Sequence, residues 1–306
     1  MIKNYPHTRK SFLVCICSYL RFHEKCLWEE WKMKHEIIRK EDLNPKDYLI
    51  EVKAPMVAKK MQPGQFVVLM THPKGERIPM SVQKAENGNV TMFIRKLGKT
   101  SVELYTYKVG DHLENVIGPM GNPVEIKKYG NVAVCSDLVC GHAENYALCK
   151  ALSQVDGNHV ISMQTFPSKD MMYLEELRGK SNEYYITLED GSYGIKGHYR
   201  DILEKLMKQG KIDMVFAGGR TEEYVLLSEL TKAYNVPTMV TLRPIMVDAT
   251  GMCGSCRVFI DGEMKLACID GPMFNAHKVN FKELLNRVKL FKKQEAIALE
   301  NYNKMR

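Results

Sequence analysis

Two rhythms of hydrophobic and polar positions divide the chain. In the first, up to about residue 128, short runs alternate apolar with polar side chains and break at Gly, Pro or Asn-Gly, a pattern typical of antiparallel strands joined by tight turns. The runs are DYLIEVKAP, PGQFVVLMTH, RIPMSVQKAENGNVTMFIRK and SVELYTYKVGDHL. They predict an antiparallel β-barrel that requires no helix before the chain leaves it.

After Gly130 the rhythm changes, and apolar strands alternate with helical stretches. NVAVCS precedes AENYALCKALSQV, and the same alternation continues through HVISMQTF, MMYLEELRGK, EYYITLED, HYRDILEKLMKQG, IDMVFAGG, TEEYVLLSELTKAY and VPTMVTL. This order predicts a parallel sheet covered by helices, the doubly wound α/β architecture. Its ligand sites lie at the carboxyl ends of the strands.

The pattern predicts five segments. They are a leader or mis-assigned start at 1–32, a barrel at 33–128, an α/β domain at 129–243, a cysteine module at 244–281 and a helical tail at 282–306. The leader resembles a weak signal peptide, but no small-residue cleavage site follows it, so we expect either a functional start at Met33 or a poorly ordered extension.

Composition narrows the function classes. The net charge of +8 arises from the two ends, because residues 1–32 carry six basic and three acidic side chains and residues 278–306 carry eight and three. The body between them is neutral, and no basic face with interleaved aromatics argues for nucleic acid. Nine cysteines without a clean secretory signal favour a reducing compartment, the cytoplasm. No apolar run approaches the roughly 18–20 residues that span a bilayer, so no membrane association is expected.

The stretch DATGMCGSCRVFIDGEMKLAC, residues 248–268, carries the clearest chemistry. Cys253 and Cys256 form a C-x2-C turn, and Cys268 follows across an apparent hairpin. Aligned with the C-x4-C-x2-C run of a plant-type iron–sulfur site, this spacing puts the remaining ligand at Asp248. A structural zinc site with the same four ligands, or free thiols in a hairpin, would also suit the spacing.

A longer run, NVPTMVTLRPIMVDATGMCGSCRVFIDGEMKLACIDGPMFNAHKVNF, resembles the C-terminal module of one flavoprotein family. These are the small subunits of NADH-dependent reduced ferredoxin:NADP oxidoreductase, or sulfide dehydrogenase, which are related to the dihydroorotate dehydrogenase electron-transfer subunit. The resemblance extends from about residue 33 to residue 291. It implies a ferredoxin-reductase-like protein with an FAD barrel, a Rossmann-like domain and a [2Fe-2S] cluster. The implied cluster ligands are Asp248, Cys253, Cys256 and Cys268.

Two barrel motifs match the flavin site of such proteins, although each alone would suit an ordinary strand or turn. In RIPMS, an arginine can offset phosphate charge and a serine can hydrogen-bond the isoalloxazine edge. In GKTS, a glycine lets the backbone approach phosphate at a helix start, where side chains add donors. The predicted FAD-binding residues are Arg77, Pro79, Met80, Ser81, Gly98, Lys99, Thr100 and Ser101.

The α/β domain departs from the family's pattern. Where the family has a loop of roughly G-G-G-x-G-x-A-P for a nicotinamide dinucleotide, this chain has CSDLVCGHAEN and keeps only Gly141. Asp137 and Glu144 add negative charge there, so NAD(P)H binding stays open. In the same stretch we expect His142 on a surface or loop, and Cys140 and Cys149 as small packing residues.

The sequence therefore predicts an oxidoreductase subunit that moves electrons between a nicotinamide cofactor or a partner protein, FAD and the cluster. By resemblance, the next acceptor is a larger flavin and iron–sulfur subunit related to the small chain of glutamate synthase, with ferredoxin as a further candidate. No catalytic side chain is assigned. Two alternatives remain: a relay that lacks its own NAD(P)H site, and a non-enzymatic binding protein with zinc in place of the cluster.

Overall fold

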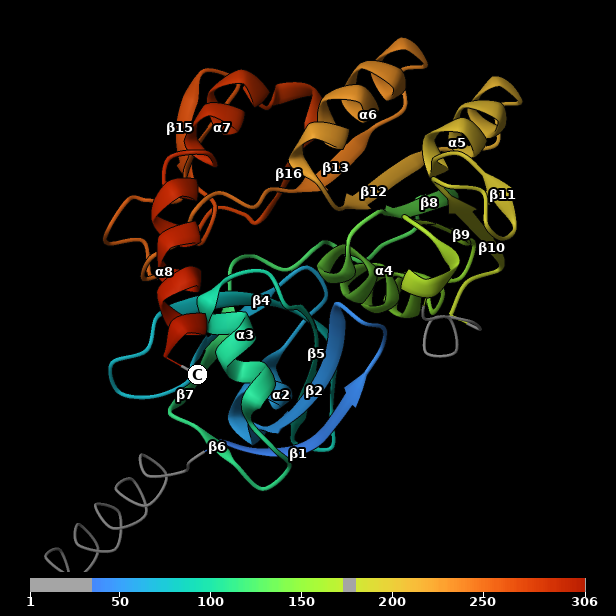
Figure 1. Ribbon diagram of the computed structural model, residues 1–306. Helices are drawn as coiled ribbons and strands as arrows, with labels where there is room; N and C mark the ends of the chain where they lie inside the picture. Colours follow the sequence, from blue (N-terminus) through green and yellow to red (C-terminus); the bar gives the residue numbers. More distant parts are fainter. Residues whose placement is uncertain (1–34, 173–179, 306) are drawn as a thin grey trace, which may run out of the picture. The chain divides into compact units, whose positions relative to one another are not determined.

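The computed structural model describes residues 35–172 and 180–305, which Figure 1 draws in colour. The predicted leader lies outside these residues, as does most of the predicted helix MMYLEELRGK. Two seven-stranded sheets and a two-stranded hairpin make up the described β structure. The fold class predicted from the sequence is confirmed, while the domain limits stay a prediction.

The first sheet is antiparallel and curls into a near-barrel with the strand order β6-β1-β2-β5-β4-β3-β7. Its strands are β1 (His35–Asp42), β2 (Asp47–Lys53), β3 (Phe66–Met70), β4 (Arg77–Glu86), β5 (Asn89–Arg95), β6 (His112–Leu113) and β7 (Asn115–Met120). Asn87 and Gly88, both at positive φ, form the two-residue turn between β4 and β5. Alternate side chains of these strands fill the barrel interior, as the binary pattern requires.

Two helices within the barrel segment correct the sequence prediction. Helix α2 (Pro55–Lys60) begins with proline, which suits a first helical position. Helix α3 (Lys99–Thr106) replaces the strand predicted from SVELYTYKVGDHL. The hydroxyl of Ser101 accepts hydrogen bonds from the backbone N–H groups of Leu97 and Gly98, both at 3.0 Å, and so fixes the start of α3. Local capping thus overrides the apparent strand alternation.

The second sheet has the order β11-β10-β9-β8-β12-β13-β16 and is parallel except for β16 at its edge. Its strands are β8 (Asn131–Ser136), β9 (His159–Phe166), β10 (Glu183–Leu188), β11 (Ile195–Lys196), β12 (Met214–Gly218), β13 (Thr238–Thr241) and β16 (Met273–Asn275). From β8 the chain builds one half of the sheet, out to β11, and then returns to build the other half from β12 to its edge. The order of the strands therefore reverses between the neighbours β8 and β12. In this architecture that switch point is where a dinucleotide usually lies.

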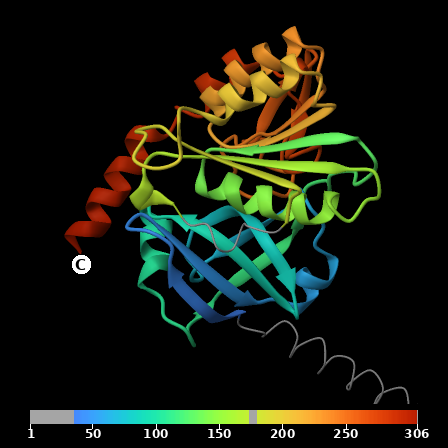
Figure 2. The ribbon, with the colours of Figure 1, turned by 90° about the vertical axis from the view of Figure 1, so that its right-hand side faces the viewer.

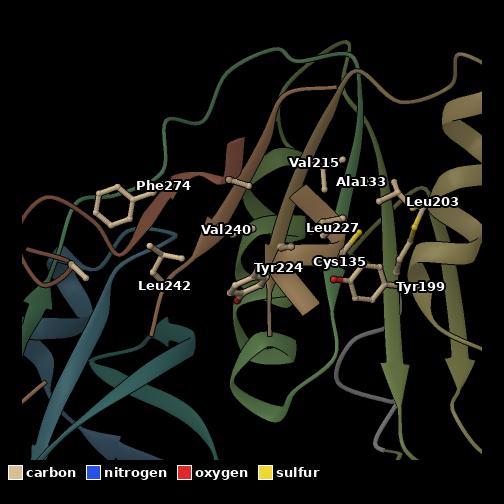
Figure 3. Close-up of a cluster of buried hydrophobic side chains, with 14 of the residues drawn as sticks. Ala133, Cys135, Tyr199, Leu203, Val215, Tyr224, Leu227, Val240, Leu242 and Phe274 are labelled. Atoms are coloured by element: carbon tan, nitrogen blue, oxygen red, sulfur yellow. The ribbon is translucent and has the colours of Figure 1, made fainter. Parts of the chain in front are cut away.

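Helices cover both faces of the parallel sheet. On one face, Ala133 and Cys135 of β8 pack with Tyr199 of α5 (Tyr199–Lys208) and Tyr224 of α6 (Thr221–Ala233), as Figure 3 shows. The intervening β8 residues, Val132 and Val134, pack on the other face with Leu148 of α4 (Val139–Leu152). Period-two alternation along one strand therefore feeds two separate cores.

Helix α4 lies between the parallel sheet and the near-barrel (Figure 2). Its residues Val139, Ala143 and Tyr146 pack against Leu49 and Phe93 of the barrel strands. A helix covered on both sides must carry apolar side chains, or polar side chains with hydrogen-bond partners, around most of its circumference. As a result, the first turns of α4 bring the carboxyl end of β8 against the barrel.

The cysteine module contains the hairpin of β14 (Arg257–Ile260) and β15 (Glu263–Leu266). The tail forms two helices, α7 (Phe281–Arg287) and α8 (Lys292–Lys304), and α8 lies against α3. Among the described residues, no helix is both long and apolar enough to cross a membrane.

Candidate functional site

The four predicted cluster ligands fall into two pairs. The sulfur atoms of Cys256 and Cys268 lie 3.2 Å apart, and both side chains are buried. Asp248 and Cys253 form the second pair, in which Asp248 Oδ2 accepts a hydrogen bond from the Cys253 backbone N–H at 2.9 Å. A [2Fe-2S] cluster takes two protein ligands on each iron, so this two-by-two arrangement fits its donor set.

The backbone between Asp248 and Cys256 turns sharply. Ala249, Gly251 and Gly254 all have positive φ, at 60°, 86° and 66°. At Gly251 a β-carbon would also lie 2.7 Å from Ile269 Cγ1. Glycine is therefore required there by both conformation and space.

Electrostatics differ between the two pairs. A hydrogen bond from the Thr250 backbone N–H holds the pKa of Asp248 below its usual value, and the Ser255 hydroxyl lowers the pKa of the exposed Cys253 thiol. Burial raises the pKa of Cys268 to about 12. Because metal ligands must be deprotonated, the raised pKa of Cys268 opposes metal binding at that thiol, whereas the lowered pKa values of Asp248 and Cys253 favour it at theirs.

The predicted flavin motif RIPMS forms one face of β4. Arg77 and Pro79 are exposed, Ser81 is partly buried, and all three share a face because they alternate along the strand. Met80 packs against the barrel core on the other face. Its side chain therefore points away from the surface that would meet a flavin.

The second motif, GKTS, forms the start of α3. Gly98 precedes the helix, and nothing lies within 4 Å of where its β-carbon would be. Lys99 Nζ lies 3.2 Å from Glu103 Oε2, and the Thr100 hydroxyl bonds to Glu76. An open backbone approach with first-turn N–H groups and a lysine suits a pyrophosphate, so these residues fit FAD.

A buried carboxylate joins three parts of the fold at the edge of this face. The Ser81 hydroxyl of β4 donates to Glu144 Oε1 of α4 at 2.5 Å, and Arg243 Nη2, after β13, donates to the same oxygen at 2.7 Å. Glu144 is 8% exposed, and its Oε2 has no hydrogen-bond partner among the described residues. Oε2 lies 2.6 Å from where a β-carbon on Gly218 would be, so only glycine leaves room for it.

A second buried carboxylate occupies the switch point of the parallel sheet. Asp137 accepts hydrogen bonds from Arg220 N at 2.9 Å and from Arg220 Nε at 2.8 Å, and His198 Nε2 lies 3.7 Å from it. Although burial alone raises it, the nearby His198 ring and the hydrogen bonds from Arg220 hold the pKa of Asp137 below its ordinary value. A β-carbon on Gly219 would meet Asp137 Oδ1 at 1.7 Å. The Asp137 carboxylate can therefore occupy this position only because residue 219 is glycine.

Further charges surround Asp137. Glu223 Oε2 lies 3.5 Å from His198 Nε2 and 2.9 Å from Arg200 Nη2, and Glu189 pairs with Arg220 at 2.6 Å. The carboxylates of Asp137, Glu189 and Glu223 outnumber the guanidinium groups of Arg200 and Arg220 by three to two, and the His198 ring lies between two of these carboxylates. We refer to these six residues as the switch-point cluster.

Gly141 has a role in packing. A β-carbon there would lie 2.0 Å from the Gly218 carbonyl oxygen, because β12 crosses the start of α4 at that point. In dinucleotide folds the glycines of this loop serve the tight turn, the approach to pyrophosphate and the helix–strand contact. Gly141 provides the last of these, the helix–strand contact.

Comparison with known proteins fits this arrangement. Residues 243–280 match the family model described as the iron–sulfur cluster binding domain of dihydroorotate dehydrogenase B. A Thermotoga maritima protein named dihydroorotate dehydrogenase B (NAD(+)) electron transfer subunit homolog is 38% identical over 272 residues, which cover 88% of this chain and 96% of that protein. The chain belongs to the family of the dihydroorotate dehydrogenase B electron-transfer subunits. It is thus a ferredoxin-reductase-like oxidoreductase subunit with an FAD domain and an iron–sulfur cluster domain.

Solved structures of similar proteins support the assignment of the chain to this family. A structure of NADH-dependent reduced ferredoxin-NADP oxidoreductase, described in connection with flavin-based electron bifurcation, aligns with a TM-score of 0.82 and 37% identity over 89% of this chain and 98% of that one. The ferredoxin reductase of carbazole 1,9a-dioxygenase aligns with a TM-score of 0.58 over 67% of this chain and 66% of that one. At 15% identity, this second likeness shows the fold alone.

Within this family fold, one minor expectation was wrong. His142 is buried in α4 at 2% exposure, where its Nδ1 lies 2.8 Å from Ser136 Oγ and its ring stacks on Phe166. Burial lowers the pKa of His142 to about 3, so the ring is neutral. Cys149 is buried and donates to Asn145 Oδ1, as a packing residue would.

Arg220, His198 and Arg243 were missed by the sequence analysis. They stand 83, 61 and 99 residues from the carboxylates that they face, and no local motif marks them. The pair Gly218-Gly219 at the end of β12 was an available signal. Two consecutive glycines that follow a buried strand indicate that something else must fit closely there.

Proposed function

We propose that this chain relays electrons between FAD, a [2Fe-2S] cluster and a larger partner subunit, without a nicotinamide site of its own. The observation that carries the proposal is Asp137, whose carboxylate stands at the switch point where a dinucleotide would place its pyrophosphate. Bound FAD supplies conversion between electron pairs and single electrons, and an iron–sulfur cluster carries single electrons.

The residues present define how each group would be held. Arg77 and the first turn of α3 meet the phosphates, and Ser81 lies at the flavin edge. Asp248 with Cys253 would bind one iron, and Cys256 with Cys268 the other. A carboxylate ligand is harder than a thiolate and can be protonated, so it should alter the cluster potential.

Charge and shape both oppose a dinucleotide at the switch-point cluster. Of the glycines in the family's loop only Gly141 is kept, and the excess of carboxylates over guanidinium groups in the cluster opposes a pyrophosphate. Both arginines that could have bound phosphate already bind carboxylates at 3.0 Å or less. A nucleotide would have to break these pairs before gaining any contact.

The cysteine module offers a surface for the partner. Val247, Met252, Met264 and Ile269 are exposed around the predicted ligands, and Met252 is 87% exposed. Apolar side chains gathered beside a redox centre suit a protein interface. We infer that the partner is a larger flavin and iron–sulfur subunit related to the small chain of glutamate synthase, with ferredoxin as the second candidate.

The six free cysteines of the described chain support a cytoplasmic location.

An anaerobic visible spectrum of the purified protein, recorded before and after separate additions of NADH, NADPH and dithionite, tests the proposal. We expect flavin and cluster bands that persist with either nucleotide and bleach with dithionite. The reason is that dithionite reduces both centres directly, whereas hydride transfer needs a nucleotide bound over the flavin.

Bleaching by NADH or NADPH would show that nicotinamide binds despite Asp137, and the relay would then be wrong. A colourless protein that contains zinc would contradict the electron-transfer function itself. Binding of each nucleotide to the oxidised protein, measured by calorimetry, separates failure to bind from failure to react.

A further inference from the structure

Three side chains of the switch-point cluster converge on one point. Within residues 35–172 and 180–305, one oxygen or nitrogen atom from each of Asp137, His198 and Glu223 lies within 4.8 Å of the other two. Asp137 follows β8, His198 caps the start of α5, and Glu223 lies in the first turn of α6. Three elements that are far apart in the sequence thus bring together one imidazole and two carboxylates.

The imidazole of His198 lacks a partner at this point. His198 is 8% exposed, and its buried Nε2 forms no hydrogen bond among the described residues. Nε2 lies 3.5 Å from Glu223 Oε2 and 3.7 Å from Asp137 Oδ2. Both distances exceed the length of an ordinary N–H···O hydrogen bond, about 2.7–3.2 Å. Because a buried polar atom without a partner is costly, its place between two carboxylates indicates a missing partner.

The spacing of these atoms suits a metal ion. A divalent ion with bonds of about 2.1 Å holds neighbouring ligand atoms about 3.0–3.4 Å apart, depending on its geometry. The distances from His198 Nε2 to the two carboxylates lie just beyond this range. Small rotations of the side chains would therefore bring all three groups onto one ion.

Both carboxylates keep an oxygen for an ion, although each also pairs with an arginine. Asp137 Oδ2 accepts a single hydrogen bond, from Arg220 Nε at 2.8 Å, and a carboxylate oxygen can take about two partners. Glu223 Oε2 takes two contacts from Arg200, at 2.9 and 3.0 Å. Glu223 Oε1, however, lies 3.9 Å from Arg220 Nη2, beyond hydrogen-bond distance. The arginines can thus orient the carboxylates while an ion binds them.

The tautomer of His198 sets a small cost. His198 Nδ1 accepts a hydrogen bond from the Arg200 backbone N–H at 3.4 Å, so the neutral ring carries its proton on Nε2. An ion on Nε2 requires that proton on Nδ1, and the bond from Arg200 is then lost. At 3.4 Å this bond is near the limit for a hydrogen bond, so little stability is lost with it.

We propose that Asp137, His198 and Glu223 bind one Mn²⁺ ion, with water in its remaining positions. The donor set is mostly oxygen and contains no thiolate, which suits this ion. The ion joins the end of β8 to the starts of α5 and α6, so it should stabilise the α/β domain. This inference goes beyond the proposed function, and it depends neither on FAD nor on the cysteine module.

The test titrates the intact, oxidised protein with Mn²⁺ and follows the electron paramagnetic resonance signal of the free ion, which falls on binding. Thiolates are poor ligands for this ion, so the cysteine module contributes little to the change. His198→Asn removes Nε2 but keeps a side-chain oxygen that can cap α5. The matched control is His159→Asn, because His159 is half-buried and pairs with Glu183 at 2.8 Å, away from the cluster.

We expect one Mn²⁺ per chain in the wild type and in His159→Asn. Binding should be at least about tenfold weaker in His198→Asn, because even changes outside the ligand shell typically cost about 10–100-fold in affinity. At about 100 times the dissociation constant, Mn²⁺ should raise the wild-type melting temperature by about 5–10 °C, and that of His198→Asn by about half as much or less. A tenfold excess of Ca²⁺ should leave Mn²⁺ bound, because Ca²⁺ takes oxygen ligands and gains nothing from an imidazole.

Four outcomes would overturn the metal site. These are a free-ion signal that the wild-type protein leaves unchanged at millimolar Mn²⁺, wild-type affinity in His198→Asn, an equal loss of affinity in His159→Asn, and displacement of Mn²⁺ by equal Ca²⁺. The last would leave an acidic patch without an imidazole ligand. If His198→Asn is already less stable without metal, Glu223→Gln decides, because it keeps the size of the side chain and must also weaken binding at least about tenfold.

Discussion

Cys256→Ser is expected to remove the iron–sulfur cluster while FAD stays bound. Cys256 is buried and lies 3.2 Å from Cys268, so the variant takes away one of the two thiolates that would hold the same iron. A serine hydroxyl is a harder and far less acidic donor than a thiol, and it binds iron poorly. Iron content should fall from roughly two atoms per chain to near zero, with loss of the cluster bands and of the electron paramagnetic resonance signal of the reduced protein.

Cys149→Ser is the matched control. This side chain is also buried, but it bonds to Asn145 within α4, away from the cysteine module. The control should keep its iron and its spectrum. Full iron content in Cys256→Ser would mean that the four predicted ligands are not those used, and zinc in the wild-type protein would mean that the metal itself is different.

Regular periodicity was sufficient to predict most of the architecture. The strands and helices of the α/β domain follow clear apolar runs, and the hairpin after Cys256 is marked by Asp261 and Gly262, both at positive φ. The error came where a cap competes with alternation: SVELYTY reads as a strand, but Ser101 bonds back to Leu97 and Gly98 and starts a helix. A pattern of apolar positions does not weigh such a local hydrogen bond.

The candidate site also has a part that local sequence spacing predicts and a part that depends on contacts between distant segments. The cysteine module is contiguous, so spacing alone could predict that Asp248 and Cys253 lie together, while their role as ligands stays a prediction. The charges of Asp137 and Glu144 were visible in the sequence, but their effect depends on residues brought in by other strands. Arg220 turns Asp137 from an unpaired charge into a buried ion pair, and Ser81 turns Glu144 into part of the flavin face. Contacts across 60 to 100 residues depend on the topology of the sheets, which no local pattern contains.

Gly141→Ala is expected to destabilise the protein by about 3 kcal/mol, although it adds a single methyl group. The new β-carbon would lie 2.0 Å from the Gly218 carbonyl oxygen, and a backbone atom of a central strand cannot move aside as a flexible side chain can. The melting temperature should fall by roughly 6–12 °C, as measured by calorimetry on the intact chain. Ser153→Ala, at the exposed end of the same helix, should change stability by less than about 0.5 kcal/mol.

This variant also separates two interpretations of the one glycine that the loop has kept. If Gly141 remained for a dinucleotide, alanine would weaken NADH or NADPH binding and leave the melting temperature nearly unchanged. If it remained for the contact between β12 and α4, stability would fall, and the wild-type protein would show no nucleotide binding to lose. The second result would explain why Gly141 persists when Asp137 stands in the same loop: the sheet and α4 still have to pack closely after the crevice beside them has been filled.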